Sequence, residues 1–435
     1  MLKRSQTNFM GSPRRHEGHE AKARWRLVVA RRWASVAAVM VVGLVVGCQS
    51  PADRVVIVSS LPRTGPDRQT SEAIVRGIRL AIDEAGGRAG PFRVEYRDLD
   101  NASVAAGRWT SEGEAANARR AVHDPAVVAV IGTLNSAAAR VSLPILNYAD
   151  LLMVSPANTA VGLTKPDLGL PGEPAIYRPS GRLNYLRVVP ADDVQGPLAA
   201  DWAFARGLRR VCVVDDAGVY GRGVASLFAD RCRQRGMTVL LHESIDPQAA
   251  EFRSFVAAIV AADPDLVYFG GSTQTKGGQL ARDLAAAGSE AVLLVPDGCL
   301  NQAFIAAAGP AAVEGRCFAT FGGPASGQPT PRGSAFATAF QQRYAGPPEP
   351  AAFCGYEAAA VVLRAIATAG RRDRRAITDA ALAVRDVDGV LGRWSVDGNG
   401  DTTLRRLSVS IVRDGRFVHE ETIPATAVGG ESAGG

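Results

Sequence analysis

The amino-acid sequence predicts an α/β protein built from two doubly wound, Rossmann-like lobes, each a parallel sheet with helices on both faces. From residue 54 onward, short apolar runs typical of buried strands alternate with segments of helical periodicity. A stretch rich in proline and glycine, residues 164–181, interrupts the alternation, which then restarts. The chain has 435 residues, and even without its first 47 it is longer than one hydrophobic core usually supports.

The first lobe opens with a strand at residues 54–59, whose centre consists of four consecutive β-branched residues. In segment 68–85, Ile74, Ile78 and Ile82 recur every four residues, which places them on one face of a helix. Similar patterns predict strands at 92–98, 127–131 and 151–154 and helices at 112–123 and 136–147.

The second series of elements follows residue 181. Strands are expected at 186–189, 211–214, 238–241, 266–269, 292–295 and 317–320, with helices between them such as 223–234 and 252–262. Toward the C-terminus we expect helices at 334–344, 353–369 and 375–384, a strand at 404–412 and a polar tail to Gly435. Ligands of such sheets bind beyond the carboxyl ends of the strands, so candidate residues are sought there.

The positive charge of the chain is concentrated at its N-terminus. The sequence has 49 Lys and Arg against 43 Asp and Glu, a net charge of +6, but nine of the basic and two of the acidic residues lie in 1–47. The rest of the chain has a net charge of −1. A nucleic-acid-binding domain needs clustered basic residues on its folded surface, so no nucleic-acid partner is expected.

Residues 1–47 are typical of an export signal. The apolar run 34–47 has 14 residues, which is short for a membrane span of about 20 residues and fits the apolar region of a signal peptide. Val45-Val46-Gly47-Cys48 resembles the lipobox of bacterial lipoproteins, which implies a lipid on Cys48 and an extracytoplasmic protein anchored to the cell membrane. The alternatives are an uncleaved membrane anchor, or cleavage without a lipid.

Export makes disulfides possible, and five cysteines follow Cys48. No C-x-x-C pair is present, which argues against a zinc or redox motif. Cys299 follows one strand and Cys317 opens the next, so we predict a Cys299–Cys317 bridge across that edge. We also predict Cys212–Cys232, with Cys354 free.

Two strand-to-helix loops of the first lobe are candidate anion sites. At Asn135 and Ser136 a strand ends and a helix opens, so free backbone N–H groups and a hydroxyl could bind a carboxylate. The alternative is that either residue only caps the helix. After the next strand, Ala157 leaves room for close backbone approach and Thr159 offers a hydroxyl, although a surface turn at Asn158 would explain the same pattern.

Two loops of the second lobe add an acidic and an aromatic candidate. Asp297 follows a strand end and could pair with an ammonium group, or it could belong to an ordinary Asp-Gly turn. Tyr220 could lay its ring over a ligand, or it could pack on its own lobe.

Residues 54–420 resemble the periplasmic branched-chain-amino-acid-binding proteins, the type I solute-binding components of ABC importers. The resemblance rests on Ser60-Leu61-Pro62-Arg63-Thr64-Gly65, Gly77-Ile78-Arg79-Leu80-Ala81, Ile131-Gly132-Thr133 with Ser136, Ser155-Pro156-Ala157-Asn158-Thr159-Ala160, Asp216 with Tyr220-Gly221-Arg222-Gly223, Tyr268-Phe269-Gly270-Gly271, Pro296-Asp297-Gly298, and Gly392-Arg393-Trp394 with Asp397-Gly398-Asn399-Gly400-Asp401.

The resemblance implies a ligand site between the two lobes, which close on the ligand. Ser136 and Thr159 match residues that hold an amino acid's carboxylate, and Ala157 matches a backbone contact to its ammonium group. Asp297 matches an acidic partner of that ammonium, and Tyr220 matches a ring over the ligand. The implied partners are an ABC permease and ATPase, and the protein is expected to be a monomer without a cofactor.

The sequence departs from the family pattern at two positions of the expected pocket. Segment 67–70 lacks an aromatic residue that the family often has there, and Ser272 replaces a tyrosine after Gly270-Gly271. With fewer apolar walls, a more polar solute than a branched aliphatic amino acid is a reasonable ligand.

The resemblance also implies three crossovers between the lobes. We expect them near 188–190, 320–322 and 390–393, where proline and glycine residues occur. The first lobe would comprise 53–188 and 321–390, and the second 189–320 and 391–430.

The sequence leaves two other classes of function as alternatives, an exported enzyme and a ligand-sensing lobe. An exported enzyme would need a nucleophile with its base, or a metal set, and the sequence has no G-x-S-x-G, P-loop or H-E-x-x-H motif. Asp397, Asn399 and Asp401 imitate the start of a calcium loop, but Thr402 replaces the required glycine, so a turn is favoured and no metal is expected. A ligand-sensing lobe for a membrane receptor or kinase would have the same pocket as an importer component.

Overall fold

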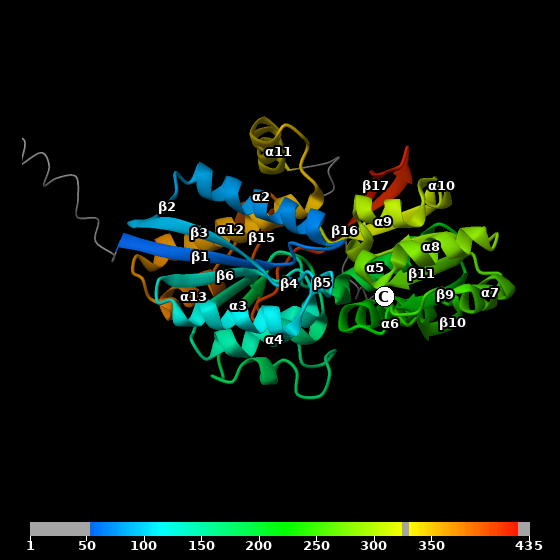
Figure 1. Ribbon diagram of the computed structural model, residues 1–435, viewed down its shortest axis with the longest axis horizontal. Helices are drawn as coiled ribbons and strands as arrows, with labels where there is room; N and C mark the ends of the chain where they lie inside the picture. Colours follow the sequence, from blue (N-terminus) through cyan, green and yellow to red (C-terminus); the bar gives the residue numbers. More distant parts are fainter. Residues whose placement is uncertain (1–52, 324–329, 425–435) are drawn as a thin grey trace, which may run out of the picture. The chain divides into compact units, whose positions relative to one another are not determined.

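The computed structural model describes residues 53–323 and 330–424, which form an α/β fold with two large sheets (Figure 1). The first sheet has the strand order β2-β3-β1-β6-β7-β8, and only β2 runs antiparallel to its neighbour. Its strands are β1 (Arg54–Leu61), β2 (Arg88–Ala89), β3 (Phe92–Asp100), β6 (Val127–Gly132), β7 (Leu152–Ser155) and β8 (Tyr185–Arg187). The five parallel strands therefore follow a doubly wound order with β1 inside the sheet.

Both faces of the first sheet are covered because the central strand is apolar on both sides. In β1, Val55 and Ile57 join the core under α2 (Arg68–Glu84), α12 (Pro350–Ala369) and α13 (Arg374–Leu382). Val56 and Val58 point the other way, into the core with α3 (Ser111–His123) and α4 (Ser136–Asn147). Figure 1 shows α2 and α12 on one side of β1 and β6, and α3 and α4 on the other.

Helix α12 is the only helix in the described ranges that is long and apolar enough to cross a membrane. Two-thirds of its most apolar segment is buried inside the fold, where the helix packs against α2. Close contact between these helices depends on two glycines: a Cβ on Gly77 would meet the carbonyl oxygen of Ala352 at 2.1 Å, and one on Gly355 that of Ile74 at 2.2 Å. The apolar composition of α12 is explained by its place in the core.

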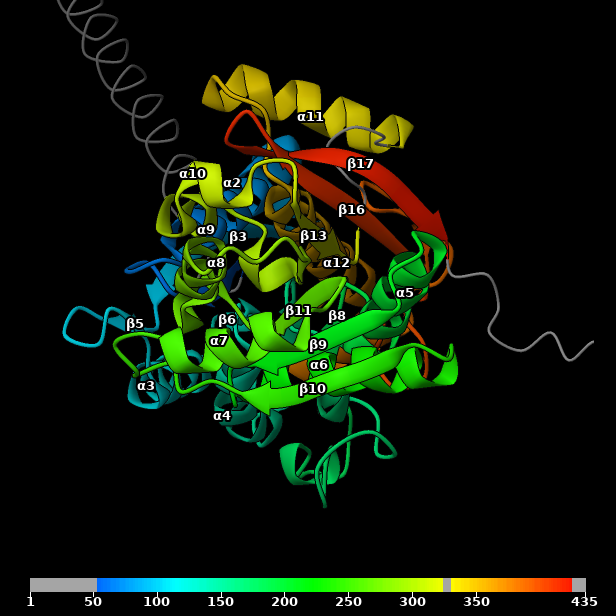
Figure 2. The same ribbon diagram turned by 90° about the vertical axis from the view of Figure 1, so that its right-hand side faces the viewer.

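The second sheet has the order β10-β9-β11-β12-β13-β16-β17, which Figure 2 shows from its own side of the molecule. Its strands are β9 (Arg210–Asp215), β10 (Thr238–Ser244), β11 (Leu266–Gly270), β12 (Val292–Val295), β13 (Cys317–Phe321), β16 (Arg406–Arg413) and β17 (Arg416–Pro424). Helices α5 (Asp192–Ala205) and α6 (Val219–Gln234) cover one face. The other is covered by α7 (Arg253–Ala262), α8 (Gly277–Ala286), α9 (Gln302–Ala308) and α10 (Pro310–Val313). The predicted pair of doubly wound lobes is confirmed.

The C-terminal segment differs from the polar tail that we predicted. Strand β17 pairs antiparallel with β16, and the turn between them contains Asp414 and Gly415, both at positive φ. An Asp-Gly pair between two strand-like segments is a hairpin signal, and the alternation of polar residues in β17 concealed it. Residues 425–435 lie outside the described residues.

The chain passes between the sheets at three places. It leaves β8 for α5 through 188–191, and it leaves β13 at Phe321 to continue in α11 (Pro331–Tyr344). The third crossing lies later than the expected 390–393, because Leu391, Trp394 and Leu404 pack in the core of the first sheet. The chain reaches the second sheet only at β16. Before β16 the chain forms a small hairpin of β14 (Val387–Gly389) and β15 (Gly392–Trp394). A second small hairpin joins β4 (Ala102–Ser103) and β5 (Arg108–Trp109).

The predicted disulfides are wrong, because all five cysteines of the described chain are free. Cys212 and Cys232 lie on opposite faces of the second sheet, in different cores. Cys299 lies beyond the carboxyl end of β12, whereas Cys317 starts the neighbouring parallel strand β13 and pairs with Leu293. The end of one parallel strand and the start of the next lie at opposite edges of a sheet, so the bridge we expected cannot form. Cys354 is free, as predicted.

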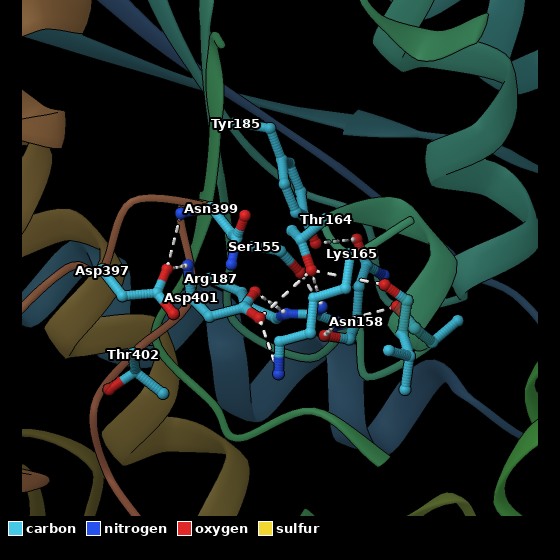
Figure 3. A network of polar contacts seen from close by, with 12 residues as sticks. Ser155, Asn158, Thr164, Lys165, Tyr185, Arg187, Asp397, Asn399, Asp401 and Thr402 are labelled. Atoms are coloured by element: carbon cyan, nitrogen blue, oxygen red, sulfur yellow. Dashed lines mark hydrogen bonds and ion pairs between the residues drawn. The ribbon is translucent and has the colours of Figure 1, made fainter. Parts of the chain in front are cut away.

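A buried ion pair connects two of the crossings (Figure 3). Arg187, at the end of β8, is fully buried, and its Nε lies 2.7 Å from Oδ1 of Asp401 in the turn before the last crossing. Burial alone would raise the pKa of Asp401, but the charges of Arg187 and Lys165 lower it. Lys165 also pairs with Asp193 in the first turn of α5, at 2.5 Å. Segments far apart in the sequence are therefore held at one point.

Replacing Asp401 should destabilise the fold strongly. Asp401→Asn leaves the Arg187 charge buried without its counter-ion, and we expect a loss of about 3–5 kcal/mol in the free energy of unfolding. The matched control is Asp388→Asn, which breaks the exposed pair with Arg332 and should cost less than about 1 kcal/mol. Urea unfolding of the ligand-free protein measures both, and equal losses would contradict the prediction.

Candidate functional site

A cavity of about 760 Å³ lies where the carboxyl ends of the strands of both sheets face each other. The first sheet contributes loops after β1, β6 and β7, and the second contributes loops after β9, β11 and β12. The strand order reverses between β1 and β6 in the first sheet and between β9 and β11 in the second. Such reversals open a crevice at the carboxyl ends of the strands, where ligands bind. The topology therefore puts two such crevices opposite one another.

All the residues predicted to contact a ligand line this one cavity: Asn135, Ser136, Ala157, Thr159, Tyr220, Ser272 and Asp297. The first four come from loops of the first sheet and the last three from loops of the second. Among these predicted residues, the first lobe supplies hydroxyl, amide and backbone groups, and the second supplies a carboxylate, a phenol and the hydroxyl of Ser272.

The N-terminus of α4 faces the cavity with its backbone N–H groups. Asn135 is its N-cap residue, but its side chain makes no capping hydrogen bond, so the simple cap interpretation of Asn135 is wrong. Ser136 Oγ accepts a hydrogen bond from the backbone N–H of Ala160 at 3.3 Å, which joins the loops after β6 and β7. The positive end of a helix with a serine hydroxyl suits a carboxylate.

Asn158 holds the same two loops together from beneath. Its side chain is fully buried, and its Nδ2 donates to the carbonyl oxygens of Thr133 at 2.9 Å and Leu134 at 3.1 Å. The surface-turn alternative for this residue is therefore wrong. Its position fixes Ala157 and Thr159 on either side of it against the N-terminus of α4.

Asp297 is the centre of the opposite wall. Its Oδ1 accepts hydrogen bonds from Tyr220 Oη at 2.5 Å and from Gln195 Nε2 at 2.8 Å. Burial raises the pKa of Asp297 above its usual value, and the two hydrogen bonds only partly offset this. Within the described ranges no Lys or Arg pairs with Asp297, so its carboxylate is available to a cation in the cavity.

Sequence reasoning missed Gln195 and Asp192, which stand behind Asp297 on α5. Asp192 is fully buried, and burial together with the nearby Asp297 raises its pKa well above the usual value. Both lie at the start of α5, shortly after the end of β8, but residues 188–190 are predicted to be a crossover between the lobes and not a strand-to-helix loop of one sheet, so the strand-end pattern did not mark them. Their role depends on α5 returning against the loop after β12.

Asp67 is a second acidic group of the cavity that sequence reasoning did not single out. It precedes α2, is only 6% exposed and lines the cavity. Asn135 Nδ2 donates a long hydrogen bond of 3.4 Å to its Oδ2. Burial raises the pKa of Asp67 to about 6, although the hydrogen bond from Asn135 opposes this.

Nothing in the described ranges forms a metal site of three or more His, Cys, Asp or Glu. The segment that imitates a calcium loop is a turn: Asp397 Oδ1 accepts the backbone N–H groups of Asn399 and Asp401, at 2.8 and 2.9 Å. Figure 3 shows these residues next to Arg187, with the Asp401 carboxylate used in the ion pair.

The two-sheet architecture and the cavity between the strand ends agree with a family comparison. The model of the periplasmic binding protein family matches residues 55–416. This chain belongs to that family. The family is one of substrate-binding proteins and not of enzymes.

Relatives cover nearly the whole fold. The Leu/Ile/Val-binding protein BraC3 of Rhizobium johnstonii is 28% identical over 364 residues, which are 83% of this chain and 92% of that protein. The crystal structure of the leucine-binding protein LivK from Thermotoga maritima has a TM-score of 0.74 and 26% identity, covering 85% of this chain and 99% of its own. LivJ of Streptococcus pneumoniae, solved with isoleucine, shares the fold with a TM-score of 0.73 at 20% identity, over 85% of this chain and 99% of its own.

The raised pKa of Asp67 should make the stability of the ligand-free protein depend on pH. Its pKa is higher in the folded chain than the usual 3.8, so its protonation stabilises the fold below about pH 4, and this contribution is lost as the pH rises to about 6. Asp67→Asn removes the effect, so its stability relative to the parent should increase by about 2 kcal/mol between pH 4.5 and 7.5. Chemical unfolding at both pH values tests this.

The matched control is Asp83→Asn, which changes an exposed carboxylate at the other end of α2 and should alter the free energy of unfolding by less than about 1 kcal/mol. The same difference from the parent at both pH values for Asp67→Asn would contradict the prediction.

Proposed function

We propose that this chain is an extracytoplasmic solute-binding lipoprotein that captures an amino acid between its two lobes for an ABC importer. The proposal rests on the opposite polarity of the two walls of one cavity. The positive end of α4, with Ser136 and Thr159, forms one wall, and the carboxylate of Asp297 lies on the other. A zwitterion fits both, with its carboxylate at the helix and its ammonium group at Asp297.

Contacts to both lobes provide the free-energy difference that favours a closed state. A ligand that binds both walls interacts more strongly when they approach, and only such differential binding shifts a conformational equilibrium. The names of the relatives support an amino-acid ligand, because they are leucine-, isoleucine- and valine-binding proteins. The importer's permease and ATPase are the expected partners.

Removing the Asp297 carboxylate should weaken binding of the amino acid. Asp297→Ala leaves the ligand's ammonium group without its counter-ion in the closed cavity, and we expect the Kd to rise by about 10²–10³-fold. Ser136→Ala should have a smaller effect, because backbone N–H groups still hold the carboxylate. Isothermal titration of both variants, with the tightest-binding member of a panel of the twenty amino acids, measures this.

The control for Asp297→Ala is Asp230→Ala, which removes an exposed carboxylate of α6 in the same lobe and should leave the Kd unchanged. The ligand-free Asp297→Ala protein should still fold, which its thermal unfolding checks, although Tyr220 and Gln195 lose their shared hydrogen-bond acceptor. Unchanged affinity would remove Asp297 from the site.

Lipidation of Cys48, which lies outside the described residues, is the proposed means of anchoring. In bacteria grown with a radiolabelled fatty acid, the parent chain should acquire label and sediment with membranes, because acyl chains partition into the bilayer. Cys48→Ser should do neither, while Cys354→Ser, a change of a buried thiol, should behave as the parent. Label on Cys48→Ser would contradict the assignment.

A further inference from the structure

The cavity has an acidic group that a simple zwitterion does not use. Asp67 belongs to the first lobe and Asp297 to the second, so the two carboxylates lie on different walls. Among residues 53–323 and 330–424, Asp67 forms no ion pair. The ligand's α-ammonium group is taken by Asp297 in the proposed function, on which this inference rests.

Asn135 presents an unused hydrogen-bond acceptor next to Asp67. The Nδ2 of Asn135 is directed at Asp67, while its Oδ1 is buried and accepts no hydrogen bond within the described structure. A buried acceptor without a donor destabilises the structure that contains it. Both side chains line the cavity, so the unsatisfied amide oxygen lies at its wall next to the Asp67 carboxylate.

The basic residues of the cavity do not neutralise Asp67. Lys276 Nζ donates to the backbone oxygen of Ala249 at 2.5 Å, and Arg108 lies on an exposed strand of a small hairpin. The cavity wall is mixed: it includes the polar residues Thr70, Gln274 and Thr275 as well as the apolar Ile74, Trp109 and Leu134. Closing the lobes on an aliphatic side chain would bury the Asp67 charge further without any partner.

We propose that the solute is a basic amino acid, whose side-chain cation binds between the Asp67 carboxylate and the Asn135 amide oxygen. The α-carboxylate then lies at the N-terminus of α4, next to Asn135 in sequence, and the α-ammonium group at Asp297. A cavity of about 760 Å³ is large enough for a long side chain.

The test compares cationic amino acids with neutral ones of similar shape. Titrating the full chain at pH 7.5 with L-arginine and L-citrulline, and with L-lysine and L-norleucine, should show at least about 10-fold tighter binding of the cationic member of each pair. Asp67→Asn should reduce this preference to less than about 3-fold, because the cationic members lose their counter-ion and the neutral members no longer bury an unpaired charge. Asp83→Asn, on the same helix, should keep the full preference.

The outcomes separate this inference from the proposed function. Tighter binding of leucine or norleucine than of arginine or lysine would overturn the basic ligand while an amino-acid-binding function stands. A cation preference that survives in Asp67→Asn, shown to be folded by its thermal unfolding, would overturn the role of Asp67. Failure of the parent chain to bind any amino acid would overturn the proposed function itself.

Discussion

The buried ion pair between Arg187 and Asp401 is the constraint on which the geometry of the cavity depends. Besides Asp401, Arg187 Nη1 donates to the backbone oxygens of Asn158 at 3.1 Å and Ala160 at 2.9 Å, so it holds the loop after β7 that contains Thr159. Its own backbone N–H donates to Gly400 at 3.0 Å. One side chain thus links the first crossing, the last crossing and one wall of the cavity. A buried guanidinium persists only when such partners compensate its desolvation.

Lys165 and the first turn of α5 connect the crossings between the sheets to the cavity. Lys165 contacts Asp401 on the first-lobe side and Asp193 on α5, and α5 also contains Gln195, the donor to Asp297. The acidic wall of the second lobe is therefore positioned by the same helix that Lys165 contacts.

The charge distribution in the cavity is unusual because its acids are buried without basic partners in the described chain. Burial raises the pKa of Asp67, Asp216 and Asp297, and none of the three forms an ion pair within the described chain. A protein accepts this cost where a ligand supplies the missing charge. The departures of segment 67–70 and Ser272 from the family pattern agree with such a polar site.

The sequence by itself determined the elements and the edge at which chemistry occurs. Apolar runs and helical periodicity are local patterns, so the sequence predicts where each strand ends. Ser136, Thr159, Tyr220 and Asp297 follow such strand ends. Because the strands are parallel, these residues lie at the carboxyl edges of the two sheets, where they line one cavity. Only the tertiary structure decided which side chains meet across long distances in the chain. Gln195 reaches Asp297 because α5 packs beside β12's loop, and Asn135 reaches Asp67 across two neighbouring strands. The same limit explains the failed disulfides: the face of the sheet and the direction of the strand, not the spacing in sequence, place a cysteine.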